Sequence, residues 1–124
     1  MLTHRSRVVF EMDVAPDFPR FDSMVETSAY RIVQEAVTNA FKHAQADRIS
    51  IRLSLQGRNA AIVVEDDGRG IDYAAATTSH GIGLAAIRER AELIGATIEI
   101  STKVNRGTRL TLTFPVAETR ILKV

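Results

Sequence analysis

The chain has 124 residues, of which 45% are hydrophobic and 25% charged, values that suit one globular domain with its own core. The formal net charge of +1 gives no electrostatic case for nucleic acid or for direct contact with an acidic membrane surface. No cysteine is present and the three histidines are scattered, so disulfides, thiolate chemistry and a protein-built transition-metal site are not expected. We expect a single domain over residues 1–124, ordered from about 8 to 116.

The first part of the chain predicts a strand followed by a helix. Arg7–Val14 alternates loosely between apolar and polar residues, as a strand does. The next helix is predicted to begin at Asp22 or Ser23, either of which can cap it, with Glu26 placed for a capping box with Ser23. The helical pattern runs to about Ala44.

A hairpin is predicted next. Residues 48–55 alternate strictly with a period of two, and residues 60–65 form a second, more apolar run, with a turn at 57–59 between them. The second strand leads into DDGRGI at 66–71. Residues 73–79 are small and polar, which is typical of a mobile loop.

A second helix and a second hairpin complete the chain. The helix opens at HGIGL, residues 80–84, and Gly95 is its predicted C-cap. Its apolar stripe consists of Leu84, Ile87, Ala91 and Ile94. Strands are predicted at 97–102 and 108–114, around a turn at 105–107, with a loosely held tail from 117. Hairpins that alternate with helices predict an α+β, two-layer sandwich with a mixed, largely antiparallel sheet and both helices on one face.

The first helix carries an unusual polar stripe. On a helix of 3.6 residues per turn, one side holds Glu35, Asn39, Lys42 and His43. The opposite side holds Val33, Ala36, Val37, Ala40, Phe41 and Ala44, and would face the core. The polar stripe suits the wall of a pocket for a metal-bound phosphate. The alternative is a solvated helix face.

The two glycine boxes suggest a ligand site. Gly68 and Gly70 allow a sharp turn and close approach of a flat ligand. Asp66 can accept a hydrogen bond from an exocyclic amine such as that of adenine. The alternative for this box is a plain Asp-Gly turn.

The HGIGL box suits an anion, because glycine lets phosphate reach the N–H groups at a helix start. The alternative is a helix entry without a ligand. Gly81, Gly83 and Ala86 also match the G-x-G-x-x-A dinucleotide fingerprint, but no strand precedes them and Glu99 does not end the next strand. A P-loop is excluded because GxxxxGK[ST] is missing.

As a set, these motifs resemble the ATP-binding catalytic domain of sensor histidine kinases, within the superfamily of type II topoisomerases, mismatch-repair ATPases and a large ATP-dependent chaperone. The nitrate-sensor-like branch is similar: its R-I-x-Q-E-A-x-x-N-A-x-K-H-A, D-D-G-x-G and G-x-x-x-x-R-E-R-A patterns look like Arg31–Ala44, Asp66–Gly70 and Gly83–Ala91. The resemblance covers about Val8 to Val116 and implies the Bergerat-type ATP-binding fold, with ATP and Mg²⁺ as cofactors.

The resemblance also implies roles for individual residues. Asn39 would be the Mg²⁺ ligand, and Glu35 a catalytic or metal-linked carboxylate. Asp66 would read the adenine amino group, with Thr108 beside it through a water. The full ATP-binding set would be Asn39, Lys42, His43, Asp66, Gly68, Gly70, Ile71, His80, Gly81, Gly83, Leu84 and Thr108. Residues 73–79 would form a short ATP lid.

The function that the resemblance implies is transfer of the γ-phosphoryl group of ATP to a histidine on a separate dimerisation domain, and from there indirectly to a response regulator. The dimerisation helices are absent, and His4 lacks a helical context, so we nominate no phosphoacceptor here and expect a longer parent protein. The expected location is the cytoplasm, either free or as the cytoplasmic part of a membrane-anchored sensor. The alternatives are an anti-sigma-factor-like serine kinase and a non-enzymatic nucleotide-binding module.

Overall fold

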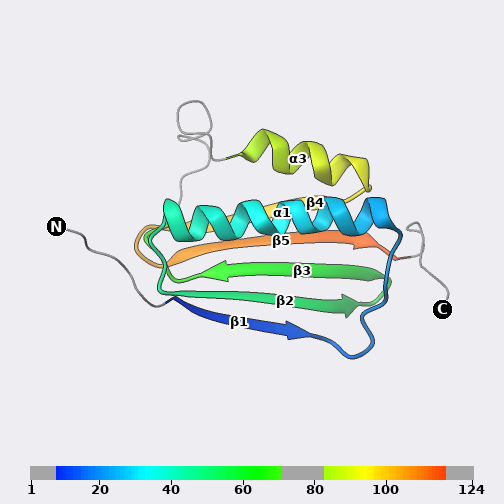
Figure 1. Cartoon of the computed structure of the whole chain (residues 1–124), viewed down its shortest axis with the longest axis horizontal. Helices are drawn as coiled ribbons and strands as arrows, with labels where there is room; N and C mark the ends of the chain where they lie inside the picture. The colour runs from blue at the N-terminus through cyan, green and yellow to red at the C-terminus, as the bar shows by residue number, and fades with distance from the viewer. Residues whose placement is uncertain (1–7, 71–82, 117–124) are drawn as a thin grey trace.

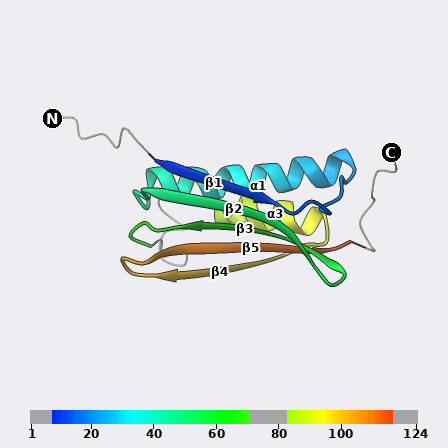
Figure 2. The same ribbon diagram turned by 90° about the horizontal axis from the view of Figure 1, so that it is seen from below.

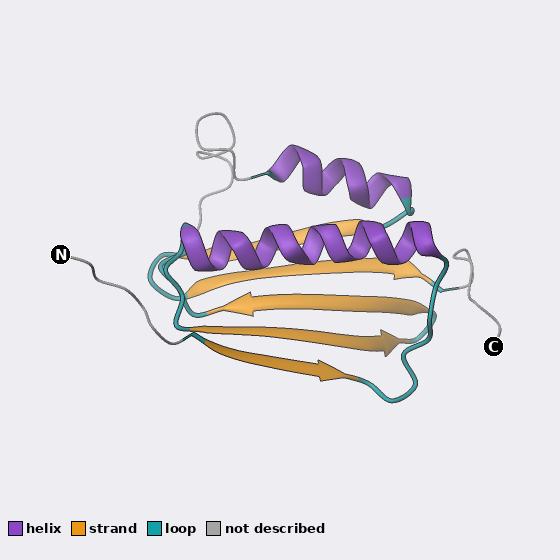
Figure 3. Cartoon of the chain, in the orientation of Figure 1, coloured by secondary structure: helices purple, strands orange, loops and turns teal. Residues whose placement is uncertain are grey.

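The computed structural model describes residues 8–70 and 83–116. Its elements, in chain order, are β1 (Val9–Val14), α1 (Ser23–Lys42), β2 (Arg48–Gln56), β3 (Asn59–Asp66), α3 (Leu84–Leu93), β4 (Thr97–Lys103) and β5 (Gly107–Pro115). Figures 1 and 3 show α1 and α3 lying side by side over one face of the sheet. None of the helices in the described ranges is long and apolar enough to cross a membrane.

The sheet has the order β1-β2-β3-β5-β4, with β1 at one edge and β4 at the other (Figure 2). β1 pairs with β2 in parallel, and the pairs β2–β3, β3–β5 and β4–β5 are antiparallel. A parallel pair needs a crossover, and α1 supplies it between β1 and β2. The predicted two-layer α+β fold with a mixed, largely antiparallel sheet is therefore confirmed.

The core lies between the helices and the sheet. Alternate residues of the central strands point toward the helices, as the period-two patterns predict. The largest fully buried apolar side chains are Phe21, Phe114, Ile32, Ile49, Ile87, Leu110 and Leu112. The rings of Phe21 and Phe114 meet edge to face with centroids 5.2 Å apart, so the loop before α1 is fixed to the last strand. Burial of each such side chain contributes about 1.5–3 kcal/mol.

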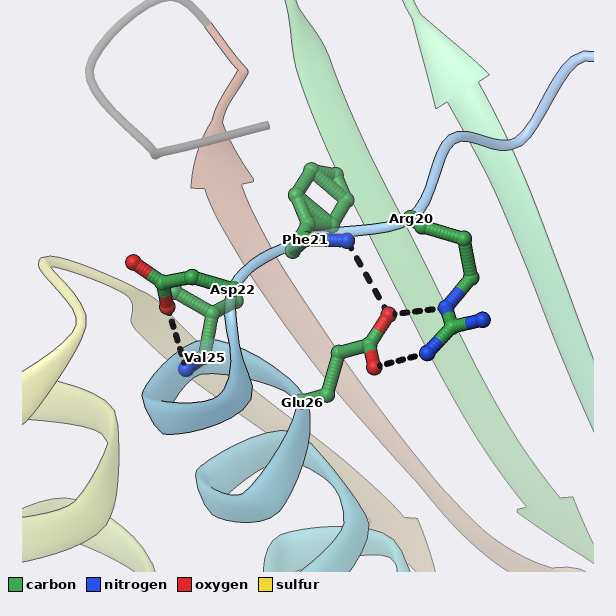
Figure 4. Close-up of polar contacts among 5 residues, drawn as sticks. All are labelled: Arg20, Phe21, Asp22, Val25 and Glu26. Atoms are coloured by element: carbon green, nitrogen blue, oxygen red, sulfur yellow. Dashed lines mark hydrogen bonds and ion pairs between the residues drawn. The ribbon is translucent and has the colours of Figure 1, made fainter. Parts of the chain in front are cut away.

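Asp22 caps the start of α1 (Figure 4). Its backbone is extended, and its side-chain oxygen accepts a hydrogen bond of 3.1 Å from the N–H of Val25. This satisfies one of the backbone donors that a helix start leaves without a partner. Of the two predicted caps, Asp22 is therefore the one that the structure uses, and Ser23 is the first helical residue.

The predicted capping box between Ser23 and Glu26 is wrong. Because the cap is Asp22, Glu26 lies four residues after it, one position too far for the box. Its carboxylate instead accepts from the backbone N–H of Phe21 at 3.0 Å and from two nitrogens of Arg20 at 2.6 and 2.9 Å (Figure 4). These bonds lower the pKa of Glu26, with the Arg20 hydrogen bond as the largest cause.

The buried face of α1 differs in part from the predicted one. Its buried residues are Val25, Ser28, Ala29, Ile32, Ala36, Asn39 and Ala40. Phe41, predicted to face the core, is 45% exposed, because it lies about 100° around the helix from Ala40, at the edge of the buried face. The helix ends at Lys42, slightly before the predicted Ala44, and His43 is its C-cap.

The end of α3 is a Schellman motif. The N–H of Gly95 bonds to the carbonyl of Glu92 at 3.2 Å, and that of Ala96 bonds to Ala91 at 2.9 Å. Gly95 has φ +66°, the left-handed conformation that this motif requires. The C-cap itself is Ile94, so the predicted glycine stop lies one residue beyond the cap.

Candidate functional site

Asp66 is the last residue of β3 and one of the few buried polar residues of the described chain. It is 9% exposed, and its Oδ1 accepts a hydrogen bond of 2.8 Å from the N–H of Gly68. Burial raises the pKa of the Asp66 carboxyl, while hydrogen bonds from the backbone N–H groups of Gly68 and Thr108 oppose that shift. A buried carboxylate that backbone donors hold in place suits the recognition of a ligand amino group.

Asp66 belongs to a polar row that crosses three strands. It is in register with Thr108 on β5, and Thr108 is in register with Thr102 on β4. Thr108 is 6% exposed, and its hydroxyl oxygen lies 3.1 Å from that of Thr102. The predicted pair of Asp66 and Thr108 is therefore adjacent, as the adenine-site hypothesis requires. Thr102 is a member that sequence reasoning missed, because register between β4 and β5 is not a local signal.

The glycines of the first box are packed against the protein's own backbone. A Cβ on Gly68 would lie 2.5 Å from the carbonyl oxygen of Ala44, and one on Gly70 would lie 2.6 Å from that of Lys103. Gly70 also has φ +85°, which favours glycine. The segment is therefore more than a plain Asp-Gly turn, because its backbone lies tightly between the end of α1 and the end of β4.

Backbone hydrogen bonds fix the same segment. The N–H of Arg69 donates to the carbonyl of Ala44 at 3.0 Å, and its carbonyl accepts from Asn105 at 2.8 Å. The Arg69 side chain donates through Nε to the carbonyl of His43 at 2.9 Å. The segment thus connects the C-terminus of α1 to the β4–β5 turn.

Asp67 is an anchor that the sequence did not reveal. Its Oδ1 accepts hydrogen bonds of 2.9 Å from the backbone N–H groups of both Asp47 and Arg48, at the start of β2. The Asp67 N–H donates to the carbonyl of Arg48 at 3.2 Å. The doubled Asp in DDGRGI is the only sequence signal for this role, and the backbone donors that it meets come from 19 and 20 residues earlier.

The polar stripe of α1 is not a uniformly solvated face. Asn39 is 1% exposed, Glu35 and His43 are partly buried, and Lys42 is exposed. The Glu35 carboxylate lies against Gly83, where an added Cβ would meet its Cδ at 2.6 Å. The structure therefore brings Glu35 to the start of α3 and buries Asn39 one turn further along the same helix.

Gly83 is the N-cap of α3, with φ +87°, and as a glycine it has no side chain with which to cap the helix. Leu84, its first residue, is partly buried. A helix start of this kind presents backbone N–H groups to an anion. Three predicted ATP-site residues, Ile71, His80 and Gly81, lie outside the described residues, as do the predicted lid at 73–79 and His4.

The oxygen donors that the structure presents suit a magnesium ion whose other ligands are waters and phosphate oxygens. Within residues 8–70 and 83–116, no cluster of three or more acidic or histidine side chains could hold a metal alone. Asn39 and Glu35 offer hard oxygen donors on one helix. Mg²⁺ commonly keeps several waters and phosphate oxygens beside one or two protein ligands.

The described part of the chain has a polar hollow and an apolar hollow, which are lined by different residues. A polar hollow of about 300 Å³ lies beside Asp66 and Thr108 and is also lined by Lys103 and Arg106. An apolar hollow of about 340 Å³ lies between β1 and α1. Its walls include Met12, Val14, Phe21, Tyr30 and Phe114, and none of the predicted site residues that the structure describes.

The lining residues Glu65, Arg109 and Ser101 of the polar hollow are in register with one another, one residue away from the row of Asp66 and Thr108, so their side chains point to the opposite face of the sheet. The polar hollow therefore opens on the other side of the sheet from the Asp66 side chain, and the apolar hollow is also separate from the candidate site.

Comparison with known proteins supports a single family. Residues 24–118 match the family model described as "Histidine kinase-, DNA gyrase B-, and HSP90-like ATPase". The chain is 41% identical over 99 residues to the oxygen sensor histidine kinase NreB of Staphylococcus carnosus (strain TM300), a stretch that covers 80% of this chain and 28% of that protein. The chain thus spans less than a third of this relative's length.

Solved structures show the same fold. The blue-light activated histidine kinase EL346 of Erythrobacter litoralis matches with a TM-score of 0.77 at 22% identity, over 92% of this chain and 37% of that one. The histidine kinase AdeS of Acinetobacter baumannii matches with a TM-score of 0.73 at 19% identity, over 90% and 55%. The predicted resemblance is confirmed. The chain belongs to the family of histidine kinase-, DNA gyrase B- and HSP90-like ATPases.

Proposed function

We propose that this chain is an ATP-binding catalytic domain that binds Mg²⁺-ATP and donates the γ-phosphoryl group to a histidine on a separate dimerisation domain. The observation that supports the proposal most directly is the buried Asp66 carboxylate at the end of β3, beside the buried Thr108. The family match and the relatives named as histidine kinases support the same assignment.

Asp66 recognises the adenine base. Its carboxylate only accepts hydrogen bonds when ionised, and adenine presents an amino group as donor. Thr108 lies beside it and contacts the base through a water. Gly68 and Gly70 keep the surrounding backbone close to α1 and β4, so that Asp66 has a fixed direction.

Residues of α1 and the start of α3 hold the triphosphate. Asn39 is the protein ligand of the metal, and Glu35 lies at the contact between the two helices. Bound Mg²⁺ supplies charge neutralisation for the phosphate oxygens. Lys42 contacts phosphate, His43 borders the nucleotide, and Gly83 and Leu84 present the start of α3. We assign Ile71, His80 and Gly81 to the same nucleotide site.

Phosphoryl transfer depends mainly on positioning and charge neutralisation, so little covalent chemistry is required of this domain. The partner domain supplies the acceptor imidazole and the in-line geometry. The isolated chain therefore binds ATP but transfers its phosphoryl group slowly, and the partner raises the rate by a factor on the order of 100 or more. We further propose that the domain acts in the cytoplasm and that a response regulator receives the phosphoryl group later.

The experiment mixes the chain with a separately supplied histidine-bearing dimerisation domain of a sensor histidine kinase and γ-labelled Mg²⁺-ATP. Phosphohistidine that forms on that domain supports the proposal. Acid-stable phosphoserine on a protein substrate would favour the anti-sigma-factor-like serine kinase instead. Nucleotide binding without any transfer to the partner would favour a non-enzymatic binding module.

A further inference from the structure

β1 is an edge strand whose main chain pairs with only one neighbour in the described part of the chain. The N–H of Val9 donates to the carbonyl of Asp47 at 2.8 Å, and the N–H of Ala15 donates to that of Leu53 at 2.9 Å. Successive residues of a strand direct their N–H and C=O groups to opposite sides. The odd-numbered residues of β1 therefore bond to β2, and the even-numbered residues direct their main-chain groups to the open side, which we call the outer edge of β1. These even-numbered residues are Phe10, Met12 and Val14.

The side chains of Phe10, Met12 and Val14 form an apolar row on the helix-covered side of the sheet. They are in register with apolar residues of β2 that belong to the core or pack against it. The three residues of β1 are nevertheless 49% to 67% exposed, because neither helix lies over β1 (Figure 1). Met12, Val14 and the exposed Tyr30 line the apolar hollow between β1 and α1. The same residues thus offer main-chain bonds at the outer edge and apolar surface beside it.

β1 itself has none of the sequence features that usually keep an edge strand from pairing. Edge strands commonly carry Lys or Pro or contain a bulge. β1 contains neither Lys nor Pro, and its six residues pair with β2 in an unbroken register. A regular, exposed and apolar edge of this kind favours the addition of another strand.

The far face of β1 is acidic, which disfavours pairing with a second copy of the chain. The Glu11 carboxylate lies 2.8 Å from Nη1 of Arg48. The Asp13 carboxylate lies 3.8 Å from Nε of Arg52. Antiparallel pairing of two copies with Met12 opposite Met12 would place Glu11 of one copy opposite Asp13 of the other. Shifting the register by two residues would place Glu11 opposite Glu11 or Asp13 opposite Asp13, and like charges directly opposite each other are destabilising.

β2 shows which kind of strand β1 accepts as a neighbour. Its helix-facing residues are apolar, and its far face carries Arg48 and Arg52, which are the partners of Glu11 and Asp13. An outer strand with the same alternation would place apolar side chains beside the apolar row and cations opposite the two carboxylates. Opposite charges in such cross-strand pairs are stabilising. The charges of β1 therefore favour a basic partner strand over a second copy of the chain.

We propose that the outer edge of β1 binds an extended segment of a partner protein in which apolar residues alternate with lysine or arginine. The segment adds one strand to the sheet, and its main chain pairs with Phe10, Met12 and Val14. Its apolar side chains cover the apolar row, and its basic side chains lie opposite Glu11 and Asp13. None of these residues belongs to the proposed nucleotide site, so the inference does not depend on the proposed function.

The test uses a labelled eight-residue peptide, blocked at both ends, in which valine alternates with lysine. The control peptide has glutamate in place of lysine. Fluorescence anisotropy measures the affinity of the chain for each peptide, and amide hydrogen exchange followed by NMR locates the bound peptide.

Two sets of variants separate the charge from the main-chain bonds. Glu11→Gln combined with Asp13→Asn removes both carboxylates, and Glu99→Gln is the matched control, because Glu99 is exposed on the same face but on the opposite edge strand, β4. Met12→Pro removes one N–H of the outer edge without removing a bond to β2, a position where an edge strand tolerates proline. Met12→Ala is its control, because it shortens the side chain but keeps the N–H. The charge variants decide alone if Met12→Pro does not fold.

The wild-type chain should bind the lysine peptide roughly 5-fold or more tightly than the glutamate peptide, because two cross-strand pairs change from opposite to like charges. The lysine peptide should slow the exchange of the Phe10, Met12 and Val14 amides, which should exchange rapidly without it. The preference for lysine should be lost in the variant without both carboxylates and kept in Glu99→Gln. Met12→Pro should bind the lysine peptide roughly 2- to 12-fold more weakly than Met12→Ala, as expected for one lost hydrogen bond.

No binding of the lysine peptide, equal affinity for both peptides, or exchange protection at β4 instead of β1 would overturn the inference. Slow exchange of the three β1 amides without peptide would also overturn it, because the outer edge would then already be occupied. Protection of these amides that rises with the concentration of the chain alone would assign the edge to a second copy and refute the proposed partner.

Discussion

Glu35 on α1 and Gly83 before α3 are in such close contact that a Cβ on Gly83 would lie 2.6 Å from the Glu35 Cδ. This contact joins the helix that carries Asn39 to the helix start assigned to phosphate. Gly83 also has φ +87°, so it meets two requirements at once: a conformation that disfavours side chains and a space that excludes them.

Gly83→Ala should therefore weaken Mg²⁺-ATP binding, because Glu35 must move to accommodate the new methyl group. Gly95→Ala is the matched control: Gly95 has φ +66° but nothing within 4 Å of an added Cβ. Both variants should lose about 1–2 kcal/mol of folding stability from the backbone conformation, measured by urea unfolding. Only Gly83→Ala should lose nucleotide affinity, measured by calorimetry. Equal affinity losses would show that the Glu35 contact has no part in binding.

A double-mutant cycle separates the two effects at Gly83. Glu35→Ala removes the side chain that the new methyl group meets but leaves the backbone conformation unchanged. The two substitutions should be non-additive by about 0.5–3 kcal/mol in unfolding free energy, as is usual for residues in contact. Strict additivity would contradict the steric explanation.

The stability of the fold should depend on the ionisation of Asp66. Burial raises the folded-state pKa of Asp66 above the ordinary 3.8. The contribution of this shift to the free energy of unfolding is therefore complete below pH 3.8 and is lost as pH rises through the folded-state pKa. Asp66→Asn removes this dependence, so the variant should become more stable relative to wild type as pH rises from about 4 to about 8. Urea unfolding across that range is the measurement, with Asp17→Asn, in an exposed loop position, as the control for one lost charge. A variant that becomes less stable relative to wild type as pH rises would contradict this prediction.

Asn39→Ala should reduce the Mg²⁺ dependence of triphosphate binding more than it reduces adenosine binding. The amide oxygen is a hard neutral ligand on α1, and adenosine has no phosphate to bring a metal to it. Calorimetry with adenosine and with ATP, each with and without Mg²⁺, makes the comparison. Equal losses for adenosine and Mg²⁺-ATP would assign Asn39, which is 1% exposed, a structural role.

The start of α1 should depend on Asp22 and not on Ser23. Asp22→Ala removes the 3.1 Å bond to the N–H of Val25 and should cost about 0.5–2 kcal/mol of stability. Ser23→Ala should cost much less, because Ser23 is already helical. Urea unfolding of both variants decides the point, and a larger loss for Ser23→Ala would contradict the observed cap.

Much of the fold could be predicted because its signals are local. The alternation in residues 48–55, the glycine stop at Gly95 and the two helical stripes each depend on neighbours within a few residues. The adjacency of Asp66 and Thr108 was predicted from the family resemblance. It follows in the structure from the β3–β5 register.

The features that were missed depend on distant backbone. Asp67 meets donors 19 and 20 residues earlier in the chain, and Thr102 acquires its partner only through the pairing of β4 with β5. The Glu26 carboxylate was assigned to the wrong partner because a shift of one residue in the helix start moves it out of the capping box. Phe41 was misplaced because the edge of an apolar stripe is poorly defined on an amphipathic helix.

The central claim is that the buried Asp66 carboxylate selects adenine. Its most direct test is calorimetric titration of the wild-type chain and of Asp66→Asn with Mg²⁺-bound ATP and GTP analogues that resist hydrolysis. The wild type should bind the ATP analogue far more tightly than the GTP analogue, and a folded Asp66→Asn should lose affinity for the ATP analogue by roughly 30-fold or more. Wild-type affinity in the folded variant, or equal binding of both analogues by the wild type, would contradict the claim.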